Sequence, residues 1–508
     1  MSDFKLTDEQ QYAKECAANG ETFVMDAVAG SGKTSTAREM CKVLEGRGLY
    51  LVYNSSAAAD AKKSFPRDVK VSTTSALAWN RYPEYQDRMR PGSPRVRAKD
   101  TAALVGLTQP IQLGGSIVIN PISVASMALE TIQKFCYSAD TRISEKHTPP
   151  APAGLEMLQE DLIRSEVAVW ARKIWADAIK VDSKHRFTFD YAFKLMVMSP
   201  PDLGYDTVII DEAQDSNWAT LHLLKAQVNS QLIAIGDPAQ QLYSWRGASD
   251  IMGEFGGKRL PLSKSFRFGE RIAEEANKWL EHTQTPIRVT GNEQMDSIVT
   301  DRPLQRVDAV LCRSNAAVME RAIEEMESGK KVAIVGGTQA LVTLAKAAGD
   351  LMEGKKTSHP ELSAFSDWGD LMAFTQEPGG GDLKALVQLI NTHKVSGILK
   401  ACNSLVAETP QEAKYQRRTF VSPDAVISTA HKSKGREWMN VEIGDDFKEP
   451  EDVEDPLGIS RPEPGPIGRH NAMLHYVTVT RARRQLNRGS LAWIDRRKPV
   501  DKLKKAAL

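Results

Sequence analysis

A lysine and a threonine at the end of a run of small residues could bind the phosphates of a nucleotide. Residues 27–34 read Ala-Val-Ala-Gly-Ser-Gly-Lys-Thr and lie between an apolar run and a helical pattern. Small residues let backbone N–H groups turn toward phosphate oxygens, and the N-terminus of a following helix adds positive potential. Lys33 can reach the β- and γ-phosphates, and the Thr34 hydroxyl can ligate Mg²⁺. The expected phosphate-binding residues are Ala29, Gly30, Ser31, Gly32, Lys33, Thr34 and Ser35.

Two adjacent carboxylates follow the apolar run at 207–210. Asp211 can hold Mg²⁺, directly or through water, and Glu212 can polarise an attacking water. Two carboxylates at the end of a buried strand are costly unless a cation compensates them. The pair therefore predicts a second element of the same nucleotide site.

Polar and aromatic side chains close to the apolar runs could recognise a nucleotide or a base. Gln10 lies upstream of the phosphate-binding residues, and its carboxamide can both donate to and accept from the edge of adenine. A solvent-exposed helix glutamine is the alternative interpretation. Gln240 follows the apolar run at 231–236 and could sense a γ-phosphate. Two aromatic residues come next, Tyr243 and Trp245, and they could stack on bases.

Apolar runs alternate with helical patterns, which predicts an α/β fold with a parallel sheet and helices on its faces. Ligands of such sheets bind at the C-terminal ends of the strands. Tyr53 and Asn54 fall at one of these ends, and Thr74 falls at another. Tyr53 could therefore stack on a base, although a strand-end tyrosine also suits a core or an interface.

Between residues 79 and 184 the pattern becomes mostly helical and predicts an inserted helical region. An arginine-rich run at 88–99 is a candidate contact for a phosphate backbone, and a solvated loop is the alternative. Disorder is the simple interpretation of the basic tail at 496–508. We expect no nuclease-like segment and no second activity.

The composition indicates a globular protein of several domains. The chain has 508 residues, 41% of them hydrophobic and 26% charged, and its formal net charge is +1. Since the global charge is balanced, a nucleic-acid surface must be a local patch. The five cysteines include no C-x-x-C pair, which argues against a zinc site or a disulfide framework and fits a reducing cytoplasm. We expect no signal peptide and no membrane span, because neither pattern occurs.

Short motifs follow one another in a fixed order along the chain: LTDEQ, AVAGSGKT, VYNSSAAADAKKSF, VIIDEAQD, AIGDPAQQLYSWRGA, SFR, AVLCRSN, ISTAHKSKGREW and YVTVTRA. Together these motifs resemble those of the UvrD/Rep family of superfamily 1 DNA helicases. The nearest resemblance is to the F-box DNA helicase branch, although no F-box is present. Two positions depart from the family pattern: Thr73-Thr74-Ser75-Ala76 lacks a histidine, and His470-Asn471 replaces acidic residues before the last motif.

The resemblance implies two RecA-like motor domains with helical insertions. It places the first motor domain at 1–78 and 185–262, with a helical insertion at 79–184. The second motor domain would occupy 263–339 and 420–495. A small accessory insertion would lie at 340–419, shorter than is typical of the family.

The resemblance also implies roles for individual residues. Gln10 would read adenine and Glu437 would contact the sugar of the nucleotide. Arg267 and Arg481 would neutralise charge in the transition state, as arginine fingers do. The implied catalytic residues are Lys33, Glu212, Gln240, Arg267 and Arg481, with Thr34 and Asp211 on the metal. The implied DNA contacts are Tyr53, Asn54, Thr74, Tyr243, Trp245 and His431.

The implied function is that of an ATP- and Mg²⁺-dependent DNA helicase or translocase that moves 3′ to 5′ on single-stranded DNA and acts at junctions with duplex. Two alternatives stay open: a translocase that displaces proteins, and a partner-dependent, ATP-switched DNA-binding module. RNA is an alternative track. We expect a monomer without membrane contact in a bacterial or viral host cytoplasm, with a protein loading partner as an option. DNA repair and DNA replication are both compatible pathways.

Overall fold

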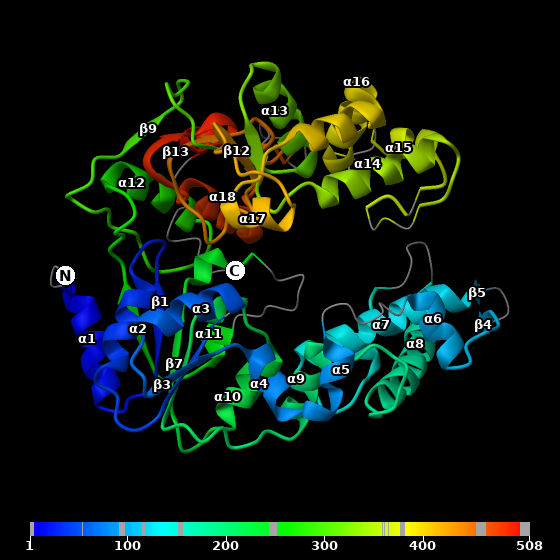
Figure 1. Cartoon of the computed structure of the whole chain (residues 1–508), viewed down its shortest axis with the longest axis horizontal. Coiled ribbons are helices and arrows are strands. Elements are labelled where there is room, and N and C mark those ends of the chain that lie inside the picture. The colour runs from blue at the N-terminus through cyan, green and yellow to red at the C-terminus, as the bar shows by residue number, and fades with distance from the viewer. Residues whose placement is uncertain are drawn as a thin grey trace. The chain divides into compact units, whose positions relative to one another are not determined.

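Two parallel β-sheets organise the computed structural model, one in each half of the chain (Figure 1). The structure describes residues 5–52, 54–90, 97–113, 117–150, 156–242, 251–357, 359, 361–363, 365–375, 381–453 and 464–497. The chain divides into two units: unit 1 contains residues 1–27 and 32–262, and unit 2 contains residues 28–31 and 263–508.

Sheet 1, in unit 1, has six parallel strands in the order β3-β2-β6-β7-β1-β8. These are β1 (Phe23–Ala27), β2 (Gly48–Leu51), β3 (Val69–Ser72), β6 (Thr207–Ile210), β7 (Gln231–Gly236) and β8 (Lys258–Leu262). All positions of β2 and β6 are buried, as expected of strands that are covered on both faces. Because β6, β7 and β1 are neighbours, the segments that follow them meet at one edge of the sheet.

Helices and short 3₁₀ turns surround sheet 1. They are α1 (Asp8–Ala18), α2 (Lys33–Cys41), α3 (Ser55–Ser64), α10 (Trp218–Lys225), α11 (Ile251–Glu254), η3 (Ala213–Asp215) and η4 (Pro238–Gln240). Thr7 begins α1 through a capping box with Gln10. Such a cap satisfies backbone N–H groups that the first helical turn leaves without partners. It also fixes Gln10 in the first turn, where its side chain is buried.

A helical region lies beside sheet 1 in the same unit (Figure 1). It contains α4 (Thr74–Arg81), η1 (Pro83–Tyr85), α5 (Gln86–Met89), α6 (Ala98–Leu104), α7 (Pro121–Tyr137), η2 (Glu145–His147), α8 (Met157–Ala178) and α9 (Phe189–Met198). Aromatic residues fill its core, among them Phe135, Trp175 and Phe187. The sequence did not predict its antiparallel pair β4 (Ile111–Leu113) and β5 (Ile117–Ile119), whose strands are only three residues long.

Sheet 2, in unit 2, also has six parallel strands, in the order β11-β12-β10-β13-β14-β9. These are β9 (Ile298–Thr300), β10 (Ala309–Cys312), β11 (Val332–Ile334), β12 (Ala425–Thr429), β13 (Trp438–Ile443) and β14 (Ala482–Asn487). The helices α12 (Glu270–Leu280), α13 (Asn315–Glu327) and α18 (Arg469–Val479) and the turn η6 (Gly489–Arg496) accompany them.

A second helical group adjoins sheet 2 on the side of β12 and α13 (Figure 1). It consists of α14 (Gln339–Met352), α15 (Trp368–Phe374), α16 (Gly381–Ser404) and α17 (Pro410–Tyr415). Its apolar residues share one core with the sheet, since Leu344 and Ile390 belong to the same buried cluster as Val310 and Ile427. At Lys394 the backbone of α16 is non-helical, which marks a kink within this helix.

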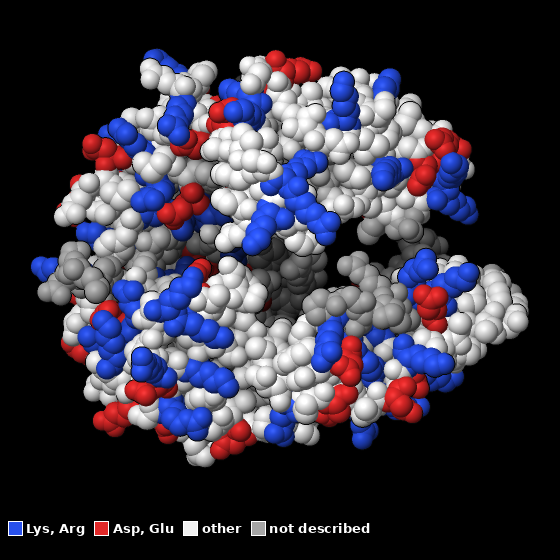
Figure 2. Space-filling model, in the orientation of Figure 1, with Lys and Arg blue, Asp and Glu red and all other residues white. Residues whose placement is uncertain are grey.

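The two parallel sheets with their flanking helices confirm the predicted α/β fold. Basic and acidic side chains are interspersed on the visible faces of both units (Figure 2), in keeping with the formal net charge of +1. Across the described ranges, no helix is both long and apolar enough to cross a membrane.

Candidate nucleotide and nucleic-acid site

The residues predicted to bind phosphate form a turn between β1 and α2. Gly30 and Gly32 adopt left-handed backbone conformations, with φ of 74° and 78°. Glycine takes this conformation readily, whereas a side chain would strain it. Because Gly32 is the N-cap of α2, Lys33 and Thr34 occupy the first turn of the helix, where N–H groups and the helix dipole favour phosphate oxygens. The predicted residues from Ala29 to Ser35 thus lie on this turn and the start of α2.

The Glu212 side chain reaches toward the same helix end. Its Oε1 lies 4.0 Å from Nζ of Lys33, and its Oε2 accepts a hydrogen bond of 2.5 Å from Nε2 of Gln214. The backbone of Glu212 is left-handed, with φ of 52°. A non-glycine residue in this region stores strain, and such strain is concentrated at functional sites. The sharp turn directs the carboxylate away from the line of β6.

Asp211 is held by contacts to both carboxylate oxygens. Oδ2 accepts a hydrogen bond of 2.5 Å from the Tyr50 hydroxyl, and Oδ1 accepts one of 2.9 Å from the backbone N–H of Glu212. Tyr50 is fully buried in β2, and its ring centroid lies 4.3 Å from that of Phe65. Burial raises the pKa of Asp211 above its ordinary value, and the adjacent Glu212 carboxylate raises it further. A cation at this position would relieve both effects.

The donor set fits Mg²⁺ bound together with a nucleotide. Asp211 offers a fixed carboxylate, and Thr34 places an exposed hydroxyl in the first turn of α2. No group of three or more His, Cys, Asp or Glu side chains positioned for a metal occurs among the described residues. Mg²⁺ commonly keeps several waters and binds through one or two carboxylates plus substrate phosphates. These residues therefore suit an ion that arrives with a nucleotide.

A chain of hydrogen bonds connects Glu212 to Gln240. Gln214 donates to Glu212 through Nε2, and its Oε1 accepts from the backbone N–H of Asp237 at 3.0 Å. Asp237 in turn accepts from Nε2 of Gln240 at 2.6 Å and from the backbone N–H of Ala239 at 3.0 Å. Gln214, Asp237 and Gln240 are all buried. The predicted water-polarising residue and the predicted γ-phosphate sensor thus belong to one network.

The Gln10 side chain is already engaged within unit 1. Its Nε2 donates to the Thr36 hydroxyl at 3.0 Å, and its Oε1 accepts from the backbone N–H of Thr7 at 3.0 Å. The side chain is 1% exposed. This burial excludes the alternative of a solvent-exposed helix glutamine. Recognition of adenine by Gln10 stays a prediction.

In unit 2, Arg267 and Glu437 form a direct ion pair. Nε of Arg267 lies 2.6 Å from Oε2 of Glu437, and Nη1 of Arg483 lies 3.4 Å from Oε1 of the same carboxylate. Nη1 of Arg267 also donates to the Thr480 carbonyl at 3.1 Å. The residues expected to contact a phosphate and a sugar therefore lie together.

Arg481 is buried beside this pair, with 1% of its surface exposed. Its guanidinium donates to the carbonyls of Val477 at 2.8 Å and Arg436 at 3.2 Å, and to the Thr480 hydroxyl at 3.0 Å. Thr480 thus contacts both Arg267 and Arg481. The role of Arg481 as an arginine finger stays a prediction.

Three of the predicted DNA contacts lie in the described part of the chain. Asn54 caps α3 through a 2.9 Å hydrogen bond from the N–H of Ala57 to its side-chain oxygen. Thr74 begins α4 and lines a cavity of about 350 Å³ that Asp211 also lines. His431 follows β12 and is half-buried. The other three lie outside the described residues, namely Tyr53, Tyr243 and Trp245, and the tail from residue 498 onward does so as well.

His431 is a neutral imidazole at physiological pH. Burial lowers its pKa to about 4, and the nearby Arg313 and His470 act in the same direction. The rings of His431 and His470 are 6.1 Å apart between centroids. A contact of His431 with DNA would therefore depend on stacking or on a neutral hydrogen bond.

The low pKa of His431 predicts an acid-sensitive contribution to stability. The folded-state pKa is about 4 and lies below the unfolded value, so this contribution is present above about pH 6.5 and is lost as the pH falls through 4. As the pH falls from 7 to 4, we expect the free energy of unfolding of His431→Asn to rise by ~1–2 kcal/mol relative to that of the unmodified chain. This figure allows for solvent screening of a partly exposed ring. Chemical unfolding at a series of pH values measures this difference. A difference that does not change with pH would contradict the assignment.

From the hydrogen bond between the Tyr50 hydroxyl and Asp211 we predict that loss of this hydroxyl weakens metal binding. Tyr50→Phe removes the donor to Oδ2 of Asp211, and loss of a group that orients a metal ligand typically weakens metal binding ~10- to 100-fold. We expect a higher Mn²⁺ dissociation constant, measured by electron paramagnetic resonance with bound ADP. Tyr85→Phe is the matched control, because the Tyr85 hydroxyl donates to the carbonyl of Ile179, also at 2.5 Å. Equal Mn²⁺ affinity in the two variants would refute an orienting role for Tyr50.

Sequence reasoning missed three residues of the unit 1 site: Tyr50, Gln214 and Asp237. Gln214 and Asp237 lie inside the motifs VIIDEAQD and AIGDPAQQLYSWRGA, so their positions next to Glu212 and Gln240 were an available signal. No local sequence feature marked Tyr50 as part of the site. A tyrosine in a buried strand is usually a core residue, and its partner Asp211 lies 161 positions away in the sequence.

Comparison with known proteins gives one family match and several relatives. Residues 10–246 match a family described as an AAA domain, a span that includes all the unit 1 site residues described above. F-box DNA helicase protein 1 of Schizosaccharomyces pombe is 26% identical over 95% of this chain and 57% of its own length. F-box DNA helicase 1 of Gallus gallus is 27% identical over 96% of this chain and 49% of its own length. The chain therefore spans about half the length of these relatives.

A similarity over a shorter stretch of the chain is found with a protein that is not named as a helicase. Gabija protein GajB of Bacillus cereus is 31% identical over 113 residues, which cover 20% of this chain and 23% of that protein. This similarity involves too little of either chain to indicate a shared role.

Proposed function

Since the chain belongs to the UvrD/Rep-like family of superfamily 1 helicases, we propose that it is an ATP-dependent motor that moves along single-stranded DNA. The observation that carries this proposal is the network from Lys33 through Glu212, Gln214 and Asp237 to Gln240. It joins a phosphate-binding lysine, a candidate base and a candidate γ-phosphate sensor. Such a network could couple the state of a nucleotide to the conformation of the segment after Gln240.

ATP would be bound by the phosphate turn, with Lys33 on the β- and γ-phosphates. Thr34 and Asp211 would hold Mg²⁺, which offsets phosphate charge when bound. Glu212 would orient a water and accept its proton, and the short hydrogen bond from Gln214 keeps its carboxylate in place. Arg267 and Arg481 would stabilise charge that develops as the phosphoanhydride bond breaks.

The residues that the resemblance implies as contacts for single-stranded DNA would offer two kinds of group. Asn54, Thr74 and His431 would supply polar groups, and Tyr53, Tyr243 and Trp245 would supply stacking surfaces. Movement in the 3′-to-5′ direction, action at junctions with duplex DNA and unwinding of that duplex belong to the same proposal. We further propose a monomer that works in a cytoplasm, and a protein loading partner is compatible with it.

A second candidate is a translocase that displaces proteins from DNA and unwinds poorly. The observation that favours it is the packing of the insertion at 340–419. Leu344 and Ile390 of this insertion share a core with Val310 and Ile427 of sheet 2. Helices anchored in this way are less free to contact duplex DNA as an independent body.

ATP hydrolysis with and without single-stranded DNA tests the proposal, beside unwinding of duplexes that carry a 3′ or a 5′ tail. We expect DNA to stimulate hydrolysis and unwinding to require the 3′ tail. Stimulation without unwinding would support the protein-displacing translocase, which a streptavidin-displacement assay then checks. Hydrolysis that no nucleic acid stimulates would contradict both motor proposals.

A further inference from the structure

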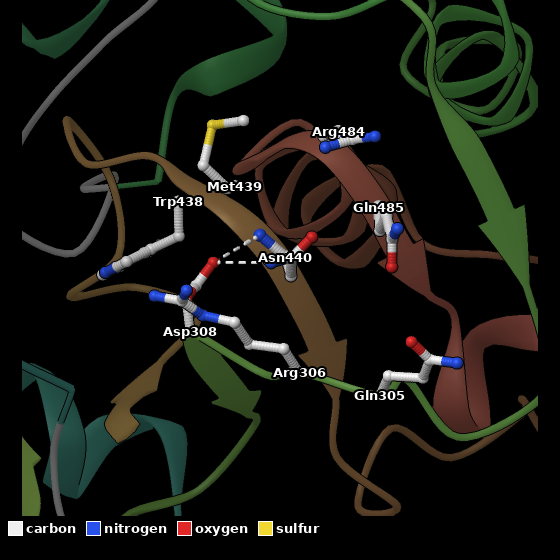
Figure 3. Close-up of a pocket in the computed structure, with 8 residues that line it drawn as sticks. All are labelled: Gln305, Arg306, Asp308, Trp438, Met439, Asn440, Arg484 and Gln485. Carbon is white, nitrogen blue, oxygen red and sulfur yellow. Dashed lines mark hydrogen bonds and ion pairs between the residues drawn. The ribbon is translucent and has the colours of Figure 1, made fainter. Parts of the chain in front are cut away.

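A pocket of about 760 Å³ opens in unit 2 at the edge of sheet 2 where β10 and β13 begin (Figure 3). This volume is within the range of pockets that hold small ligands, ~300–1,000 Å³. Its lining comes from the segment before β10, the start of β13 and the adjacent strand β14. The residues that matter here are Arg306, Asp308, Trp438, Met439, Asn440 and Arg484.

The pocket is built on a β-bulge between β13 and β14. Trp438 is opposite Ala482, but Asn440 is opposite Gln485, so β14 carries one extra residue between these pairs. A bulge interrupts the alternation of side chains along a strand and redirects them. Consecutive residues of β14, Arg484 and Gln485, therefore both line the pocket.

The free charge of the pocket is positive. Its one carboxylate, Asp308, accepts from Nε of Arg306 at 2.9 Å and from the backbone N–H and Nδ2 of Asn440 at 3.0 and 2.8 Å. Figure 3 shows these two side chains turned toward Asp308. Arg484 is exposed and makes no hydrogen bond or ion pair with any described residue. The guanidinium of Arg484 is therefore available to an anion.

The pocket also offers an aromatic face and hydrogen-bonding amides. Trp438 is half-buried, and within the described ranges its indole N–H has no partner. Met439, the second residue of β13, is 44% exposed. The amides of Asn440 and Gln485 can both donate and accept, as the edges of nucleobases require. An indole face, a free guanidinium and carboxamides together match the chemistry of a nucleotide unit.

We propose that this pocket binds one nucleotide of a single-stranded nucleic acid, with the base on Trp438 and the phosphate on Arg484. The inference rests on the proposed function in taking single-stranded DNA as the ligand. An acidic peptide would satisfy Arg484 but would leave the indole face uncovered. Trp438 directly follows Glu437, which forms ion pairs with Arg267 and Arg483. A base bound on Trp438 would therefore affect the position of Glu437 and, through it, its ion pair with Arg267.

Binding of fluorescein-labelled oligo(dT) at several salt concentrations tests the pocket. We expect Trp438→Leu to weaken binding about 5- to 100-fold, and Trp438→Phe to retain most of the affinity. Arg484→Gln should lower the slope of log K against log salt by ~0.7, the value for one phosphate contact on a single strand. Arg271→Gln is the matched control, because Arg271 is an exposed arginine of the same unit whose ion pair is with Glu274. It should leave the slope unchanged.

Photo-crosslinking gives a second measurement that does not depend on variants. Oligo(dT) containing 4-thiothymidine should crosslink to the peptide that contains residues 438–440. Wild-type affinity in Trp438→Leu together with a wild-type slope in Arg484→Gln, or crosslinks only elsewhere, would overturn the pocket while the proposed function stands. Poly-glutamate that protects Trp438 where oligo(dT) does not would overturn it in favour of an acidic partner. Failure of the unmodified chain to bind any oligo(dT) would overturn the proposed function and the pocket together.

Discussion

Glu212→Gln is expected to slow ATP hydrolysis about 10²- to 10⁴-fold while ATP still binds. Glutamine keeps the shape of the side chain but cannot accept a proton from water. The carboxylate is fixed by Gln214 at 2.5 Å and lies 4.0 Å from Nζ of Lys33. Its geometry is therefore set before a nucleotide binds, and the substitution changes the chemistry of the group more than its position.

Single-turnover hydrolysis and binding of a fluorescent ATP analogue separate the two effects. Lys33→Ala should instead weaken nucleotide binding, because it removes the cation that is proposed to bind the β- and γ-phosphates. Glu130→Gln serves as the matched control, since Glu130 is a half-exposed carboxylate on α7 paired with Lys134. Hydrolysis at the normal rate in Glu212→Gln would reject Glu212 as the base. Loss of nucleotide binding in the same variant would assign it a binding role.

The sequence predicts the local parts of the candidate nucleotide site because each has a local physical cause. Glycines at 30 and 32 signal left-handed backbone, and the helix pattern after them places Lys33 and Thr34 at a helix start. The apolar run before Asp211 predicts a buried strand, and the end of a parallel strand is where ligands bind. These inferences need no information on the rest of the chain.

The contacts that hold these parts together could not be predicted in the same way. Tyr50 contacts Asp211 only because β2 and β6 are neighbours in sheet 1. The sequence of neither strand determines which strand it pairs with. The left-handed backbone of Glu212 is a consequence of tertiary packing, since glutamate does not favour it. The burial of Arg481 by three intrachain acceptors is likewise visible only once α18 is placed against the sheet.

Arg267→Ala is expected to reduce the rate of hydrolysis about 10³-fold or more, as loss of an arginine finger does. Nε and Nη1 of Arg267 are held by Glu437 at 2.6 Å and by the Thr480 carbonyl at 3.1 Å. Among the described residues nothing bonds to Nη2, which leaves one edge of the guanidinium for a phosphate oxygen. A cation fixed in this way stabilises developing charge without reorganising.

Arg267 is a better test of this role than Arg481, because Arg481 is buried and its removal would also break its hydrogen bonds to Val477, Arg436 and Thr480. Arg267→Lys keeps the charge but loses the planar fork, so it should recover only part of the rate. Since the contact is expected chiefly in the transition state, kcat should fall much more than binding of ATP weakens. Arg271→Ala removes another arginine of unit 2 and should hydrolyse ATP normally. Weaker ATP binding in Arg267→Ala with kcat unchanged would show that Arg267 stabilises the bound ground state as much as the transition state, and would contradict its role as an arginine finger.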